Sequence, residues 1–144
     1  MAHSFRFLED IAVADIAFEA EGDSALELFQ AATDALLETL ADPSTVAMTW
    51  ERDIEHAAMG LDELLFEWLS DLVYWKDAAG VVFHDADLSV VHDGIRWKLM
   101  AVLRGAPVDQ TTQTLRNDVK GVTKHLYEVT QQGVRWYAKV VVDV

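Results

Sequence analysis

Apolar residues recur at helical spacing in only two stretches of this 144-residue chain. The first begins after an N-cap residue, Ser24, and its apolar side chains recur every three or four positions up to Leu40. The second runs from Leu61 to Trp75, and Gly80 is well placed to end it. We therefore predict two amphipathic helices, and the rest of the chain has to form its structure from other elements.

Outside these stretches, apolar and polar residues alternate, which is the pattern of half-buried strands. The alternation predicts seven strands, in residues 4–8, 15–21, 48–56, 88–91, 95–103, 126–130 and 134–142. Asp93-Gly94 separates two of them and is a strong hairpin signal. The segment Gly105-Ala106-Pro107 interrupts the pattern, and residues 109–124 are polar without a clear period. We expect a single α+β domain over residues 1–144, with the two helices packed on one face of a mostly antiparallel sheet.

The charge balance limits the partners of this domain. There are 25 acidic side chains and 11 lysines and arginines, which gives a formal net charge of −14. Nucleic acids and anionic membranes are bound mainly through Lys and Arg, so we expect no direct binding to either. A strongly acidic surface instead favours cations and a basic protein partner.

Several classes of site and location have no support in the sequence. There are no cysteines, no glycine-rich phosphate loop and no GxSxG motif, so no catalytic residue is indicated. The first ten residues carry acids where a signal peptide needs an apolar run, and no stretch has the length of a membrane span. We expect a cytoplasmic protein.

Most histidines and tryptophans have an ordinary structural interpretation. His56, His84 and His92 are expected at the surface, and four of the five tryptophans fall on apolar faces and are expected in the core. Trp75 is the tryptophan that could instead cover a partner surface. His125 stands out because it follows Lys120-Gly121-Val122-Thr123-Lys124 at the entry to a strand, although a structural role remains the simpler interpretation.

Two aspartates occupy unusual positions. Asp143 follows an apolar strand and precedes Val144, and Asp15 lies inside an apolar run. If the two met in space, their carboxylates, with the carboxylate of Val144, would form a cluster of hard oxygen donors suited to Ca²⁺ or Mg²⁺. From the residues alone, two unrelated surface carboxylates are the simpler explanation.

The chain resembles the archease family over nearly its whole length. The matching stretches are Phe7-Leu8-Glu9, Ala14 to Ala20 with Gly22-Asp23-Ser24, Leu64 to Leu72, Gly80 to Phe83, Val119 to His125, and Val142-Asp143-Val144. Their order and spacing, together with the aspartate next to the final residue, carry the resemblance.

The resemblance implies an α+β fold and a divalent-ion site at Asp15, Asp143 and Val144. The ion would most often be Ca²⁺, with Mg²⁺ or Mn²⁺ as alternatives. It also implies a function as an accessory protein that promotes guanylylation and multiple turnover of an RtcB-type RNA ligase in tRNA splicing and RNA repair. His125 matches a family histidine and is carried over as a further functional residue.

This chain departs from the family pattern in two places. The family usually has Leu-Glu-His-Thr-Ala-Asp where residues 8–15 here contain two extra residues and no histidine. Lys124 also replaces a common tyrosine before His125.

Two other functions stay open at this point. One is a chaperone for an RNA-modifying enzyme such as a tRNA methyltransferase, acting through an exposed apolar patch around Trp75 and Val81 to Phe83. The other is a small metal-dependent hydrolase that uses Asp15, Asp143 and His125.

Overall fold

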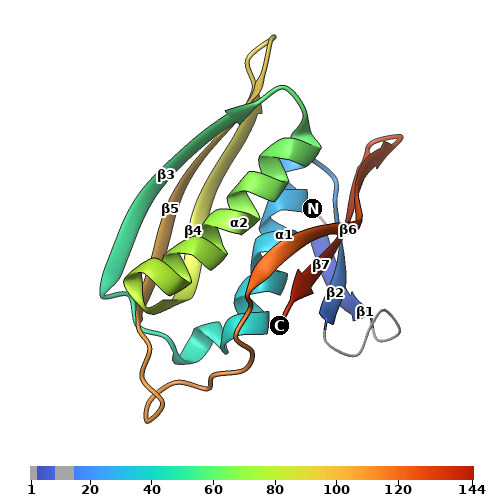
Figure 1. Cartoon of the computed structure of the whole chain (residues 1–144). Helices are drawn as coiled ribbons and strands as arrows, with labels where there is room; N and C mark the ends of the chain where they lie inside the picture. Colours follow the sequence, from blue (N-terminus) through green and yellow to red (C-terminus); the bar gives the residue numbers. More distant parts are fainter. Residues whose placement is uncertain (1–2, 9–14) are drawn as a thin grey trace.

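The computed structural model of the protein describes residues 3–8 and 15–144 (Figure 1). The two extra residues expected before Asp15 therefore fall outside the described residues. The elements in chain order are β1 (His3–Leu8), β2 (Asp15–Gly22), α1 (Ala25–Leu40), the 3₁₀ turn η1 (Pro43–Thr45), β3 (Trp50–Ala58), α2 (Leu61–Ala79), β4 (Val81–His92), β5 (Trp97–Pro107), β6 (Gly121–Gln132) and β7 (Arg135–Asp143).

Both predicted helices are confirmed, together with the residues that delimit them. The Ser24 side chain accepts a hydrogen bond from the backbone N–H of Glu27 at 3.1 Å, which satisfies one of the unpaired donors of the first turn of α1. Helix α2 ends at Gly80, whose φ of 65° lies in the left-handed region that favours glycine.

The strands form two antiparallel sheets, whereas the sequence pattern predicts helices on one face of a sheet. Strands β1-β2-β7-β6 make a four-stranded sheet, and β3-β5-β4 make a three-stranded one. The helices lie between the two sheets (Figure 1). The reason lies in α1, which buries side chains around most of its circumference and therefore has to be covered from more than one side. The fold class, α+β with mostly antiparallel strands, is confirmed.

Three strands are longer than the alternation predicts. Strand β4 begins at Val81 instead of residue 88, β5 ends at Pro107 instead of residue 103, and β6 begins at Gly121 instead of residue 126. Gly105 lies inside β5, opposite Phe83, where a Cβ would stand 2.0 Å from the carbonyl oxygen of Val82. The glycine thus allows a close approach of two strands next to a β-bulge between Phe83 and Asp85. Similarly, β6 already begins at Gly121 and contains an irregularity between Thr123 and Glu128.

One apolar core draws residues from both helices and both sheets. Its largest fully buried side chain is Trp68, whose indole N–H donates to the Thr33 hydroxyl at 2.9 Å. Trp50, Trp97 and Trp136 are half-buried against the same core, so the predicted structural role of these four tryptophans is confirmed. In the part of the chain that the structure describes, neither helix is long and apolar enough to cross a membrane.

Candidate functional site

Asp15 and Asp143 lie directly opposite one another at the ends of two paired strands. Strands β2 and β7 are antiparallel, and Asp15 and Asp143 are partners in their register. Directly opposite residues of an antiparallel pair project from the same face, with Cβ atoms about 4.5–5.5 Å apart. Two residues separated by most of the chain are therefore brought together at one end of the four-stranded sheet.

Successive side chains of a strand point to opposite faces of the sheet, and this alternation identifies the face on which the two aspartates lie. Ile16 and Phe18 pack against the core, so Asp15 shares the other face of β2 with Glu19 and Glu21. Asp143 is exposed and Asp15 is half-buried. The carboxylate pair thus lies on the side of the sheet that points away from the helices.

No basic group compensates this pair in the described part of the chain. Neither carboxylate forms an ion pair with a described Lys, Arg or His side chain. Like charges directly opposite on a sheet are destabilising, by roughly 0.2–1 kcal/mol. A bound cation would remove this repulsion.

The donors present suit a hard divalent ion and leave much of its coordination open. Among residues 3–8 and 15–144, no group of three or more His, Cys, Asp and Glu side chains is arranged to hold a metal ion. Asp15 and Asp143 would therefore act as a pair, with main-chain oxygens such as that of Val144 and water completing the six to eight oxygen ligands that Ca²⁺ takes. The oxygen chemistry fits Ca²⁺ or Mg²⁺ and does not fit zinc or copper.

The neighbouring strand holds the backbone of Asp143 in place. Gly121, the first residue of β6, is the register partner of Asp143, and the N–H of Lys120 donates to the Asp143 carbonyl at 2.7 Å. Val119, just before, is fully buried. Asp143 is thus flanked by a strand on each side, which fixes its backbone although its side chain is exposed.

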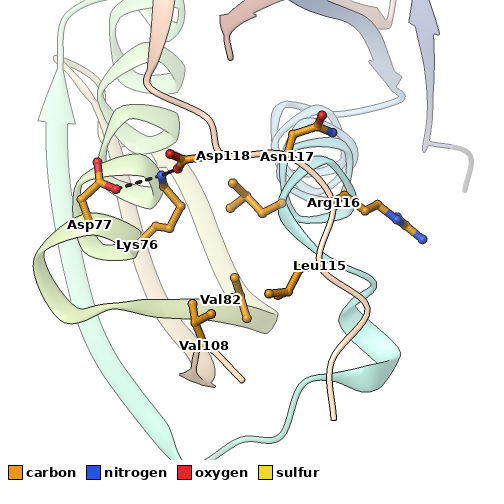
Figure 2. A pocket seen from close by; sticks show the side chains of 9 residues that line it. Lys76, Asp77, Val82, Val108, Leu115, Arg116, Asn117 and Asp118 are labelled. Atoms are coloured by element: carbon orange, nitrogen blue, oxygen red, sulfur yellow. Dashed lines mark hydrogen bonds and ion pairs between the residues drawn. The ribbon is translucent and has the colours of Figure 1, made fainter. Parts of the chain in front are cut away.

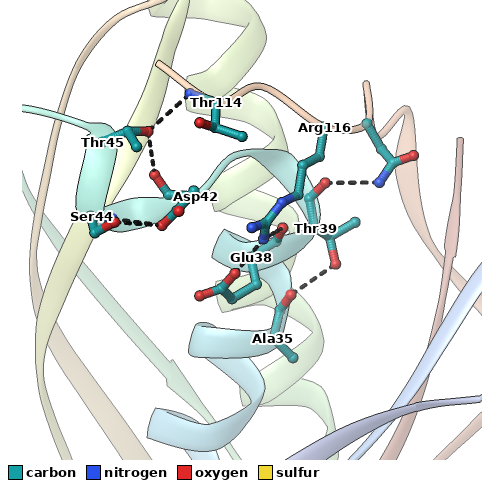
Figure 3. A network of polar contacts seen from close by, with 9 residues as sticks. Ala35, Glu38, Thr39, Asp42, Ser44, Thr45, Thr114 and Arg116 are labelled. Carbon is teal, nitrogen blue, oxygen red and sulfur yellow. Dashed lines mark hydrogen bonds and ion pairs between the residues drawn. The ribbon is translucent and has the colours of Figure 1, made fainter. Parts of the chain in front are cut away.

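Most of the polar segment predicted at residues 109–124 lies in the loop 108–120 between β5 and β6, which is ordered by the C-terminal end of α1 (Figure 3). The last carbonyls of a helix lack partners within the helix. Here Arg116 donates from its backbone N–H to the Leu40 carbonyl at 3.0 Å and from its guanidinium to the Glu38 carbonyl at 2.8 Å. Asn117 donates to the Thr39 carbonyl from both its backbone and its side chain, at 3.1 Å each. The segment therefore caps α1 and then leads directly to Lys120 and Asp143.

A pocket of about 390 Å³ opens beside this segment (Figure 2). Leu40, Val82, Val108 and Leu115 supply an apolar floor. Lys76 at its edge is only 8% exposed and is paired with Asp77 at 2.8 Å and with Asp118.

The pairing of Lys76 decides what the pocket can bind. Burial alone would lower the pKa of Lys76, but the two carboxylates outweigh burial and raise that pKa. Lys76 in turn lowers the pKa of Asp118. The other cation of the lining, Arg116, is paired with Glu38. Because both cations already have carboxylate partners, the pocket is poorly suited to a phosphate.

His125 lies apart from the carboxylate pair, on a bulge of β6. Four residues, 124–127, fall between the register partners Thr123 and Glu128, and Leu126 has a φ of 56°, which is uncommon for a side chain of its size. His125 and Leu126 are both exposed. The adjacent Lys124 ammonium lies 4.0 Å from the centre of the Phe66 ring. His125 is presented to solvent four positions beyond Gly121, and no sequence signal indicated the bulge that exposes it.

Three expectations about other residues need correction. The apolar patch proposed around Trp75 and Val81 to Phe83 is not exposed: the three strand residues are buried and Trp75 is half-buried. The Arg52 guanidinium also covers the Trp75 ring at 3.9 Å. His56 and His84 are half-buried instead of lying at the surface. His56 contacts Asp71 and Glu67 of α2, and His84 bonds to the carbonyls of Pro43 and Val46.

Comparisons with known proteins extend over nearly the whole chain. The model of the Archease protein family matches residues 5–144. The protein archease of Methanopyrus kandleri is 32% identical over 91% of this chain and 94% of its own length, and that of Pyrococcus abyssi is 29% identical over 91% and 93%.

Solved structures agree with these sequence matches. The solution structure of protein 1598 from Methanobacterium thermoautotrophicum has a TM-score of 0.81 at 25% identity, covering 98% of this chain and 99% of that one. A crystal structure from Thermotoga maritima, described as an archease and possible chaperone, has the same fold, with a TM-score of 0.63 at 21% identity over 96% and 98% of the two chains. The chain with the paired aspartates Asp15 and Asp143 therefore belongs to the archease family.

Proposed function

We propose that this chain is an accessory protein of an RtcB-type RNA ligase, which joins RNA ends carrying a 2′,3′-cyclic phosphate or 3′-phosphate to 5′-hydroxyls. It would promote guanylylation of the active-site histidine of the ligase and so allow multiple turnovers. Membership of the archease family supports this class of function. The observation that carries the proposal to particular residues is the register of Asp15 with Asp143.

Asp15, Asp143 and the main-chain oxygen of Val144 are the groups that would hold a divalent ion, with Ca²⁺ the first choice. When bound, the ion would supply positive charge between two carboxylates that otherwise repel each other. The carboxylates themselves would orient this end of the sheet toward the metal- and nucleotide-binding region of the ligase. Contact there would favour the ligase conformation in which its histidine faces the α-phosphate of GTP.

The charge of the chain supports action through a protein instead of through RNA. With 25 acidic residues against 11 basic ones, the surface repels phosphates and attracts a basic, RNA-handling enzyme. His125, exposed on the bulge of β6, is a second group that could contact the ligase.

A chaperone function is the alternative, because the Thermotoga maritima relative is described as a possible chaperone. In that case a client such as a tRNA methyltransferase would be protected by apolar contacts, and Asp15 and Asp143 would be dispensable. The buried state of Val81 to Phe83 removes the surface first expected for such contacts. A hydrolase that uses Asp15 and Asp143 with His125 as its base has less support, because His125 lies on the bulge of β6, apart from the two aspartates.

The test is reconstitution of the purified protein with the RNA ligase of its own organism, GTP and Mn²⁺. The fraction of guanylylated ligase is followed over time, and we expect the rate to rise about tenfold or more, equivalent to about 1.4 kcal/mol of barrier. An unchanged rate would overturn the proposal. Protection of a methyltransferase from aggregation without any effect on the ligase would favour the chaperone alternative.

A further inference from the structure

The three-stranded sheet leaves one of its faces uncovered. The helices lie on the other side of β3-β5-β4 (Figure 1), and alternate residues of all three strands point to solvent. On the central strand, β5, these outward residues are Lys98, Met100, Val102 and Arg104. Met100 is 58% exposed, which is unusual for a large apolar side chain in the middle of a sheet.

Acidic residues flank this apolar centre on both neighbouring strands. Asp53 and Glu55 of β3 lie opposite Val102 and Met100, and Asp87 of β4 lies opposite Val102 from the other side. Together with Met100, Val102 and Ser89, they line a groove of about 420 Å³. The surface therefore has a short apolar centre, Met100 and Val102, between Lys98 and Arg104 on the same strand, with acidic residues of β3 and β4 on either side. We call it the acid-flanked face.

These acidic residues are only partly neutralised by the protein itself. Arg104 is engaged by three carboxylates at one end of the face: Asp87 at 2.7 Å, Asp85 at 3.2 Å and Glu51 at 3.4 Å. Within the described part of the chain, no ion pair is found for Asp53 or Glu55. An attractive potential for cations thus persists beside the apolar centre.

We propose that the acid-flanked face binds a basic amphipathic helix of a protein partner. The acidic residues belong to strands on either side of β5, so the two groups are about 10 Å apart, twice the interstrand spacing. A helix with its side chains is about 10–12 Å wide. An apolar ridge of such a helix would pack on Met100 and Val102 while Lys or Arg on its two flanks reach Asp53, Glu55 and Asp87. RNA and anionic membranes would be repelled by the same carboxylates.

The proposed helix site is independent of the ligase proposal, because it lies on the other sheet from Asp15 and Asp143. It would give the protein a second surface for a basic partner, one that recognises the charge and apolar pattern of a helix instead of a particular sequence. Failure of either proposal leaves the other intact.

A synthetic peptide of about 18 residues, roughly five helical turns, tests the site. The peptide carries a leucine ridge flanked by lysines, and a scrambled peptide of equal composition serves as its control. Binding is measured by fluorescence anisotropy, and the site is mapped by NMR shifts of backbone amides. We expect the ridged peptide to bind more tightly than the scrambled one and to shift amides of β3, β5 and β4.

Three variants sharpen the test. Asp53→Asn/Glu55→Gln should weaken binding about fivefold, as expected for two surface charges, and Met100→Ser should weaken it by a similar factor. Glu63→Gln/Glu128→Gln removes the same charge from exposed positions elsewhere and should leave binding unchanged. Equal binding of the scrambled peptide, or an equal loss in the control variant, would overturn the proposal. So would self-association of the protein that Met100→Ser abolishes, because a second copy would then occupy the face.

Discussion

The two ends of the β2–β7 strand pair differ in whether their acidic residues have basic partners. At one end Asp15 faces Asp143, so acid meets acid. Further along the same strand, Glu19 faces Lys139, accepts a hydrogen bond from the Tyr137 hydroxyl and pairs with Arg6. Arg135 pairs with Glu21 at 3.2 Å and with Asp23. We call the end where Glu19, Glu21 and Asp23 have basic partners the compensated end. Its ion pairs stabilise the sheet, whereas the Asp15–Asp143 end carries a repulsion that folding alone does not require.

This difference separates structural from functional acids on one surface. A carboxylate with a basic partner lowers the free energy of the fold by a small amount. A carboxylate directly opposite another raises it, and such a cost is typically maintained at sites that bind a ligand or a partner.

Addition of Ca²⁺ should produce the largest effect. At about 100 times its dissociation constant, an ion bound only to the folded state adds about 2.7 kcal/mol to the free energy of unfolding. The thermal midpoint should therefore rise with Ca²⁺ in the wild-type protein and stay constant in Asp15→Asn/Asp143→Asn. Differential scanning calorimetry with and without EDTA measures this. An equal Ca²⁺ response in the double variant would place the ion elsewhere.

Substitution of Arg135 should destabilise the compensated end. Its guanidinium lies between two carboxylates and is 39% exposed. We expect Arg135→Gln to lower the free energy of unfolding by up to about 1 kcal/mol, as for a surface ion-pair network. Urea unfolding measures this change, and stimulation of the ligase at a temperature well below the unfolding midpoint should be unaffected.

Removal of one acid from the Asp15–Asp143 end should change the free energy of unfolding in the opposite direction. In EDTA, Asp143→Asn abolishes the repulsion with Asp15 and should raise the free energy of unfolding by a few tenths of a kcal/mol. The same urea titration measures it. A clear loss of stability would mean that the carboxylate has a stabilising contact, contrary to the comparison.

Lowering the pH should destabilise the compensated end through protonation of Glu19. The Tyr137 hydroxyl and the Arg6 guanidinium lower the pKa of Glu19 below its ordinary value. A carboxyl with a lowered pKa in the folded state contributes stability above its unfolded pKa, near 4.3, and loses it as the pH falls through the folded pKa.

Glu19→Gln should therefore reduce the dependence of the urea midpoint on pH below about 4.3 and leave the slope near neutral pH unchanged. Unfolding curves of both proteins at several acidic pH values test this prediction. Identical slopes would show that the contacts of Glu19 do not stabilise its charged form.

Much of the fold could be predicted from periodicity. The helix limits at Ser24 and Gly80 and the hairpin at Asp93-Gly94 depend on local capping and turn chemistry, which the sequence states directly. The division of seven strands into two sheets depends on long-range pairing. The bulge around His125 and the role of Gly105 also depend on the approach of distant strands, so neither carried a local signal.

The residues of the candidate site could be predicted from the sequence, whereas their spatial arrangement could not. Aspartate is rare in apolar strands, but from that alone Asp15 and Asp143 are more simply two unrelated carboxylates, and only the family resemblance implies that they share a site. Their register is decided by pairing across most of the chain. The order of segment 108–120 could not be predicted either, because its polar residues bond to the end of α1 instead of following a period.

The most direct test of the central claim is ligase guanylylation with two matched double variants. Asp15→Asn/Asp143→Asn and Glu19→Gln/Glu21→Gln each remove two negative charges from the same face of one sheet. At a temperature where both are folded by circular dichroism, we predict that the first loses stimulation of the RNA ligase and the second retains it. Equal stimulation by the two variants would contradict the claim that the Asp15–Asp143 end is the functional one.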